Sequence, residues 1–421
     1  MHRFQRHPTS LDRSSDLKLK ITSLAAIAAV AGPAFAQSNL TLHGNLDVGL
    51  LGISNTSGGV GYIPSPVNRG SDRMVKDGGL GASNWGLRGT EDLGGGLRAL
   101  FQIQGNLALD TGVVGGPNSL GTTSMWNQTA AIGLAHNAWG TIRFGRQVSP
   151  TYWAMAATDA RGGRYFGSAL TALVGINSAS GVFIGDNSNV AFGTVYNDNA
   201  ILYTSPTWSR VTANLMYAMG ETGGKTRANS QQAATAVYDD GHLKLSALFY
   251  NGYGNNLPAA TALYTRQLGS AAAASAALTA RGLTTETNTN RLSSVGALYT
   301  WDTFTVSASY MAARNPSKIQ VVPVGSTSLD MWSVGAGWRI SPFMNLTSGY
   351  YRIDDNTNAG NKATQFALAI DYHLSKRTIA YVEGATTTND GANMNLSPVY
   401  ATPVAANQDV HALMAGLRHS F

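Results

Sequence analysis

The stretch LTLHGNLDVGL, residues 40–50, alternates between apolar and polar side chains with a period of two. One face carries Leu or Val at almost every position, and the other carries Thr, His, Asn and Asp. Such alternation is typical of a β-strand that is apolar on one face and polar on the other. The stretch therefore predicts a strand that separates an apolar surrounding from a wet one.

The same alternation recurs along the chain in sixteen segments. Short links and long polar stretches alternate between these segments, so that every second connection is long. An even number of strands, with tight turns on one side and long loops on the other, is typical of an outer-membrane barrel. We therefore predict an all-β fold, a 16-stranded antiparallel transmembrane β-barrel with long extracellular loops. The predicted strands start near residues 40, 82, 97, 126, 140, 200, 209, 232, 242, 291, 303, 328, 343, 364, 377 and 409.

Composition narrows the class of protein further. Only 12% of the 421 residues are charged, about half the usual share of ~25%, while 43% are hydrophobic. The absence of Cys excludes thiolate metal sites, disulfides and cysteine nucleophiles. After residue 36 no stretch approaches 18 uninterrupted apolar residues, which excludes a helical membrane protein. A soluble, secreted all-β protein is the remaining alternative to the barrel.

Residues 1–36 differ from the rest of the chain. Lys18 and Lys20 precede a short apolar run, and Ala34-Phe35-Ala36 ends it. A basic flank, a short apolar core and an Ala-x-Ala end predict a secretory signal peptide cleaved after Ala36. The leader contains five Lys or Arg and two Asp or Glu, so its removal lowers the formal charge from +6 to +3. We expect two units, the leader 1–36 and the barrel 37–421, and draw no inference of nucleic-acid binding.

The C-terminal segment ends on an alternating face. His411, Leu413, Leu417 and Phe421 lie on the same side of the predicted last strand. Amphipathic and aromatic rings favour the membrane interface, where they form girdles at both ends of a barrel. We therefore expect Phe421 to lie at the girdle on the turn side of the membrane.

Five blocks of sequence resemble the Gram-negative general porins, especially the betaproteobacterial and neisserial type. The most specific is SNWGLRGTEDLGGGLRA at residues 83–99. Supporting blocks are GTIRFGRQ at 140–147, YTSP at 203–206, LSKRT at 374–378 and GLRHSF at 416–421. The resemblance covers residues 37–421.

The resemblance implies a barrel whose third long loop, here 148–199, folds into the lumen as a constriction. On that loop the candidate acidic groups are Asp159, Asp186 and Asp198, and the candidate basic groups are Arg161 and Arg164. The resemblance also implies a homotrimer in outer-membrane lipid and lipopolysaccharide. Barrel-assembly machinery would read the last strand, which ends at Phe421. Opposite the loop, alternation turns three cations into the lumen, and they are Arg88, Arg98 and Arg143.

The chain departs from the family pattern at two positions of the expected constriction wall. Asn84 stands where members of the family often carry Arg, and Asn127-Gln128 stands where they carry a pair with Arg. Uncharged amides form hydrogen bonds without favouring either sign of ion. We therefore expect a weakly selective pore.

The sequence thus predicts a passive diffusion channel for small hydrophilic solutes and ions, with no catalytic residue, no cofactor and no metal ligand set. The main alternative is a solute-specific channel of the sugar or nucleoside type. A barrel enzyme would need a catalytic constellation such as Gly-x-Ser-x-Gly or His-Glu-x-x-His, and neither motif occurs. An adhesin that binds a partner through its long loops is left as a further alternative.

Overall fold

The computed structural model describes residues 39–58, 64–117, 123–180, 195–254, 268–280, 289–315 and 326–421, and the single residues 261, 265, 282 and 286. The predicted leader 1–36 lies outside the described residues, and its cleavage after Ala36 stays a prediction.

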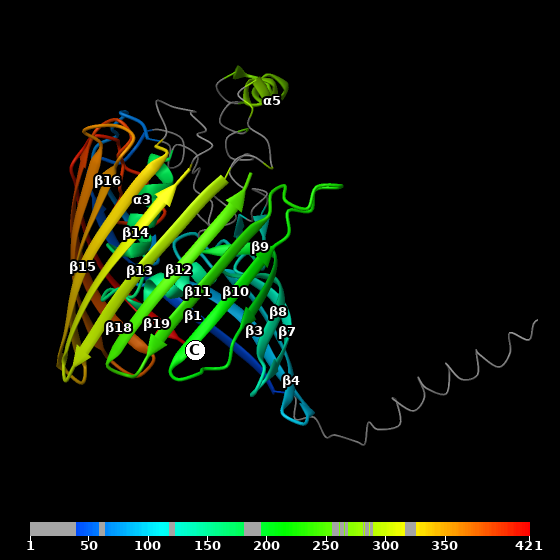
Figure 1. Ribbon diagram of the computed structural model, residues 1–421. Helices are drawn as coiled ribbons and strands as arrows, with labels where there is room; N and C mark the ends of the chain where they lie inside the picture. The colour runs from blue at the N-terminus through cyan, green and yellow to red at the C-terminus, as the bar shows by residue number, and fades with distance from the viewer. Residues whose placement is uncertain are drawn as a thin grey trace, which may run out of the picture.

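All sixteen strands expected from the alternation are present (Figure 1). Each strand pairs antiparallel with the next along the chain, and β19 returns to pair with β1, which closes the barrel. The strands are β1 (Asn39–Ile53), β3 (Asn84–Gly94), β4 (Leu97–Asn106), β7 (Thr129–His136), β8 (Gly140–Val148), β9 (Tyr196–Thr204), β10 (Val211–Ala218), β11 (Gln231–Asp239), β12 (Leu243–Tyr253), β13 (Thr289–Trp301), β14 (Phe304–Arg314), β15 (Ser328–Ser341), β16 (Met344–Asp355), β17 (Lys362–His373), β18 (Thr378–Asp390) and β19 (Val410–Ser420).

One further strand, β2 (Asp72–Asp77), lies where the sequence predicted only a polar loop. It pairs with the second half of β1, while β3 pairs with the first half. Strands β2 and β3 are therefore two parts of one interrupted position in the barrel wall. The alternation of β2 is hidden in the sequence because four of its six residues are charged.

Short turns gather at one end of the barrel, the turn end, and long connections at the other, the loop end. The long connections contain the two-residue strands β5 (Gly116–Pro117) and β6 (Thr123–Ser124). They also contain α2 (Pro150–Ala157), α3 (Ala169–Ala179) and α5 (Ala271–Ala280). The alanine-rich α5 lies beyond the loop end, as Figure 1 shows. Among the described residues, no helix has the length and apolar character needed to cross a membrane.

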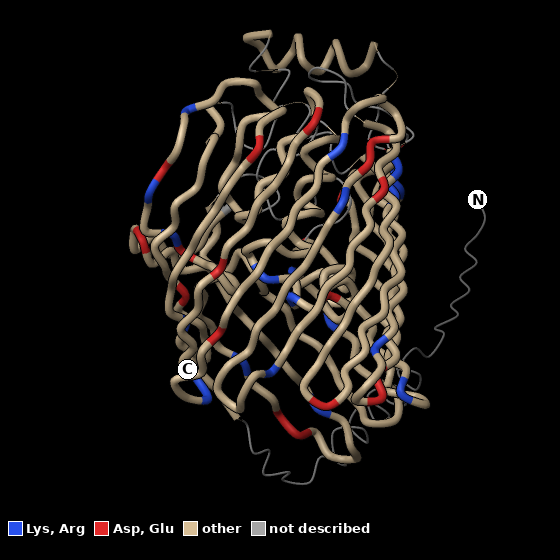
Figure 2. Tube along the Cα trace, turned by 90° about the vertical axis from the view of Figure 1, so that its left-hand side faces the viewer, with Lys and Arg blue, Asp and Glu red and all other residues tan. Residues whose placement is uncertain are grey.

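The two faces of the wall differ sharply in exposure. Leu50 is 70% exposed on the outside, whereas the next residue, Leu51, is 2% exposed on the inside. Figure 2 shows that long stretches of the strands carry no charged residue, as a lipid-facing surface requires. At the turn end the rings of Trp301, Phe304 and Trp338 stack along the outside at 6.0 and 5.8 Å between centroids. Such a row of rings is typical of the membrane interface.

The terminal residue closes the barrel at this end. The Phe421 backbone exchanges two hydrogen bonds with Gly44, at 3.0 and 3.2 Å. A Cβ atom at Gly44 would lie 2.5 Å from the Phe421 ring, so glycine leaves the room that this ring occupies. The last strand therefore ends with its terminal ring packed over Gly44 of the first strand.

The barrel interior contains two apolar clusters near the loop end. The larger one joins α2 and α3 to inward-facing residues of β9 to β17, among them Leu292, Met311 and Met331. The smaller one joins Val399 and Val404 of the β18–β19 connection to the inner faces of β1, β18 and β19. Much of the inner wall is therefore covered by packed side chains.

Candidate functional site

The remaining inner wall is polar, and we call it the open wall. It consists of the inward-facing residues of 39–45 in β1 and of β3, β4, β7 and β8. The registers Thr41↔Arg88, Arg88↔Gln102 and Gly133↔Arg143 place these side chains on the same inner face. A cavity of about 340 Å³ lies against this wall, and its polar lining is Asn39, Thr41, Arg88, Thr90, Gln102, Thr129, Arg143 and Gln147.

The arginines of this cavity keep their charge unpaired. Within the described part of the chain, neither Arg88 nor Arg143 forms an ion pair or a hydrogen bond, and the buried Nε of Arg143 has no partner. Arg98 faces the same way nearer the turn end and donates to Asn137 Oδ1 at 3.2 Å. The carboxylate of Asp92 shares this face, opposite Arg98 in the register. The described open wall therefore carries more positive than negative charge.

The predicted amides lie together near the loop end of this wall. Gln128 Oε1 accepts from Gln104 Nε2 at 2.5 Å, and Gln128 Nε2 donates to Asn106 Oδ1. Asn127 Oδ1 accepts from the Asn106 backbone N–H at 3.0 Å, and Asn84 Nδ2 donates to the Ala82 carbonyl at 3.1 Å. All three predicted amides are buried; they bond to Gln104, to Asn106 and to the backbone, and they add no charge to the wall.

The segment 150–180, which carries α2 and α3, contacts the inner face of the opposite wall. Thr158 Oγ1 lies 2.8 Å from Ser246 Oγ of β12, and the Ala160 N–H donates to Ser307 Oγ of β14 at 3.0 Å. A Cβ at Gly296 would lie 2.1 Å from Thr158 Oγ1, so the wall needs a residue without a side chain where the segment approaches. Pro150 starts α2 and a capping box with Ser168 starts α3, which fixes both helices at their N-termini.

Asp159 organises the turn between the two helices. Its carboxylate accepts backbone N–H groups from Arg161, Gly163 and Ala169, each at 3.1 Å. The Tyr351 hydroxyl of β16 donates to the same carboxylate at 2.7 Å. The sequence suggested Asp159 as an acidic group facing the water-filled path, but the structure buries it as a support for the loop.

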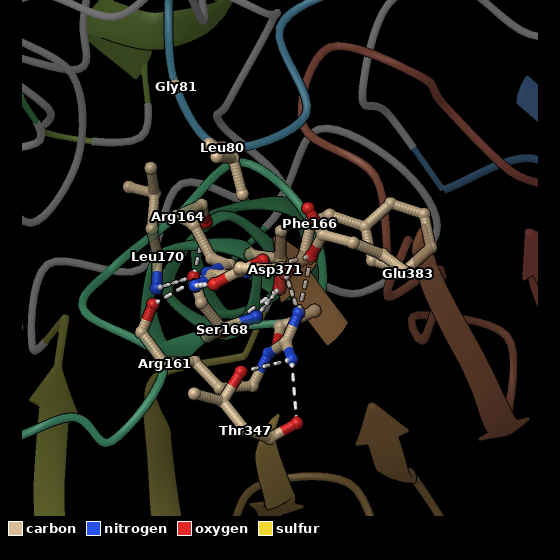
Figure 3. Close-up of polar contacts among 12 residues, drawn as sticks. Leu80, Gly81, Arg161, Arg164, Phe166, Ser168, Leu170, Thr347, Asp371 and Glu383 are labelled. Carbon is tan, nitrogen blue, oxygen red and sulfur yellow. Dashed lines mark hydrogen bonds and ion pairs between the residues drawn. The ribbon is translucent and has the colours of Figure 1, made fainter. Parts of the chain in front are cut away.

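Arg161 and Arg164 fasten the segment to β17 and β18 (Figure 3). Arg161 is 1% exposed, and its guanidinium donates to the carbonyls of Phe166 and Gly167 and to Glu383 Oε2 at 2.6 Å. Arg164 donates hydrogen bonds to both carboxylate oxygens of Asp371, at 3.1 and 2.8 Å. We call these four side chains the latch. Burial lowers the pKa of Arg161, whereas the pKa of Arg164 is raised because Glu383 and Asp371 outweigh the effect of burial.

The latch is an arrangement that the resemblance did not imply, because in it loop cations bind wall carboxylates. Neither Glu383 nor Asp371 was predicted from the sequence as a site residue. Their signal was an acidic residue on the inward face of an alternating strand, where Glu383 follows the outward Val382. Asp186 lies outside the described residues.

Comparisons with known proteins agree with this architecture. A family model described as Gram-negative porin matches residues 23–392. An outer membrane porin of Bordetella pertussis is 26% identical over 432 residues, which span 96% of this chain and the whole of that protein. Outer membrane porin protein 32 of Delftia acidovorans is also 26% identical, over 96% of this chain and its own full length.

Solved structures share the fold. An anion-selective porin from Comamonas acidovorans superposes with a TM-score of 0.65 at 21% identity, over 91% of this chain and 100% of that one. OmpF of Salmonella typhi, in complex with daunomycin, superposes with a TM-score of 0.57 at 15% identity, over 91% and 97%. Because a family model covers most of the chain and the closed barrel keeps a polar inner wall, the protein belongs to the Gram-negative porins, the passive channels of the outer membrane.

Proposed function

We propose that this porin passes small hydrophilic solutes along the open wall and favours anions over cations. The observation that carries the proposal is that two guanidinium groups without an ion pair, those of Arg88 and Arg143, line the same polar cavity. A charged ring in a narrow passage sets ion preference through electrostatics at close range. The uncharged Asn84 and Asn127 lower the number of cations, so we expect a moderate preference.

The open wall binds solutes weakly, as a passive channel requires. Its other polar groups are hydroxyls and amides, which replace part of a solute's hydration without holding it. No step of covalent chemistry is involved in this function. The protein acts as a homotrimer in outer-membrane lipid and lipopolysaccharide, and its last strand, ending at Phe421, is the segment read during assembly.

A planar-bilayer recording of refolded protein under a KCl gradient tests the proposal. We expect conductance in groups of three equal steps and a reversal potential displaced toward that of chloride. The double variant Arg88→Gln/Arg143→Gln should move the reversal potential toward zero. The matched control, Arg352→Gln, removes a cation from the outward face and should leave the potential unchanged. A folded wild type without conductance would refute the channel, and an unchanged double variant would refute the role of these arginines.

The solute-specific alternative has one supporting observation, the cavity of about 340 Å³ lined by two arginines and two glutamines. A specific site would make the flux of a small organic anion saturate with concentration in liposomes. A general channel would show a flux that rises in proportion to concentration, up to high millimolar levels.

A further inference from the structure

The β18–β19 connection, residues 391–409, is buried to a degree unusual for a loop at the end of a barrel. Val404 is fully buried, and Leu396 and Val399 are each 1% exposed. Polar residues of the same connection, such as Asn393 and Asn395, are also buried. A connection of this kind normally runs over the surface, so its burial needs a partner inside the molecule.

That partner is the inner face of the barrel. Val399 and Val404 pack in one apolar cluster with Leu51 and Ile53 of β1 and Met414 of β19. The registers Leu51↔Met414 and Ile53↔Ala412 put these wall residues on the inward face, next to the outward Leu50 and Leu413. The connection therefore folds back into the barrel rather than over its rim.

The connection is also joined to the segment 150–180. The Gly167 N–H donates to the Pro398 carbonyl at 2.7 Å, and the Tyr400 N–H donates to the Tyr165 carbonyl at 2.8 Å. The rings of Tyr165 and Tyr400 lie 4.3 Å apart, and Phe166 forms a β-bridge with Val399. Together these contacts make one packed body of the two inserted segments.

On its other side the connection is tied to the first loop. The Ser57 N–H donates to the Pro403 carbonyl at 3.0 Å, and the Ala405 N–H donates to the Asn55 carbonyl at 2.9 Å. Thr56 and Val404 form a further β-bridge. Anchored on three sides by backbone hydrogen bonds and apolar packing, the connection is held in place.

We infer that residues 391–409 form a second constricting element, which closes the lumen beside β18, β19 and β1 and confines solutes to the open wall. The segment 150–180 fills the side of β9 to β17, and the β18–β19 connection fills most of what is left. Solutes must then pass close to Arg88 and Arg143. The inference rests on the proposed channel function and adds a specificity-determining segment to it.

The test removes this element and leaves the barrel. Residues 392–408 are replaced by a Gly-Ser-Gly-Ser linker, and the single-channel conductance and reversal potential are measured in KCl. We expect the conductance to rise about twofold or more and the anion preference to fall, because ions no longer pass close to the arginines. The control replaces the exposed residues 221–227 of the β10–β11 connection by the same linker and should change neither quantity.

Two further variants keep the inference testable if the shortened chain does not assemble. Val404→Asp places a charge of the connection against the apolar inner wall and should expel the connection, which raises the conductance and its noise. Thr56→Cys/Val404→Cys should cross-link readily in a chain that otherwise has no Cys, with equal conductance before and after reduction.

The outcomes separate the two proposals. A folded wild-type protein that shows no conductance refutes the proposed channel function itself. A conducting wild type, together with an unchanged deletion or Val404→Asp variant, refutes only the second constriction. Failure of the Thr56→Cys/Val404→Cys pair to cross-link in folded protein would contradict the inserted position of the connection.

Discussion

The open wall and the wall opposite it are both built from strands that alternate between inward and outward residues. The inner face of the open wall is polar, whereas the inner face of the opposite wall is apolar near the loop end. We call the inner face of β9 to β17 near the loop end the filled wall. In β8 the inner residues include Thr141 and Arg143, whereas in β15 they include Leu329 and Met331. The difference teaches that alternation fixes which residues face inward. The inserted segments determine whether an inward residue lines the lumen or packs against protein.

The filled wall itself changes along its length. Near the loop end it is apolar, where α2 and α3 pack against Met311 and Leu292. Toward the turn end its inner residues become hydroxyls, such as Ser307 and Thr305. The apolar inner surface therefore ends where the turn after α2 meets wall hydroxyls, through Thr158 on Ser246 and Ala160 on Ser307.

The largest effect is expected where the inserted segment meets the wall through charge. Glu383→Gln should lower the free energy of unfolding by about 3–5 kcal/mol, because it leaves the buried guanidinium of Arg161 without its carboxylate. Urea unfolding in detergent micelles, followed by tryptophan fluorescence, measures it. Asp354→Asn, which breaks an exposed pair with Arg352, should cost about 0–1 kcal/mol. Equal losses in the two variants would show that the latch does not stabilise the fold.

The next largest effect is a difference in stability when a side chain is truncated on the filled wall and on the open wall. Met331→Ala on the filled wall should cost about 2–5 kcal/mol, since it removes buried atoms from a packed cluster. Gln102→Ala on the open wall should change stability by no more than about 0.5 kcal/mol, because its side chain lines a wet cavity. The same unfolding assay compares them, and a large loss for Gln102→Ala would mean that the open wall is packed as well.

Two arginine variants should show opposite behaviour. Arg143→Gln is expected to shift the reversal potential toward zero with little loss of stability, because its charge is unpaired. Arg164→Gln is expected to leave the potential almost unchanged and to lower stability, because its charge is neutralised by Asp371 and Glu383. A potential that responds equally to both would show that ions reach the latch.

The smallest effect is expected at a turn outside both walls. Asp240 accepts backbone N–H groups from Leu243 and His242, and these bonds hold the pKa of its carboxyl below the usual value. A depressed folded pKa contributes stability above the unfolded pKa, and this contribution is lost as the pH falls through the folded value. The Tm of Asp240→Asn should therefore lie slightly below that of wild type at pH 7 and match it near pH 2. A difference that persists in acid would assign the effect to packing.

Alternation predicted the fold and the inward orientation of three arginines. Arg88, Arg98 and Arg143 were placed on the inner face because each lies one residue from an outward apolar neighbour, and the register places them there. The role of Asp159, Arg161 and Arg164 could not be found in this way. They lie in a connection without periodicity, and their partners on the barrel wall are more than 180 residues away in the chain.

By itself, the sequence determined the barrel, its sixteen main strands, the end that carries the loops and the face that each strand turns to lipid. These properties are local, because a period of two is written into every strand and a lipid surround demands it. Only the tertiary structure decided that loop cations bind wall carboxylates, that β2 completes an interrupted strand, and that the β18–β19 connection enters the barrel. Contacts between distant segments depend on which surfaces fit when the wall closes, and no local pattern of residues encodes that fit.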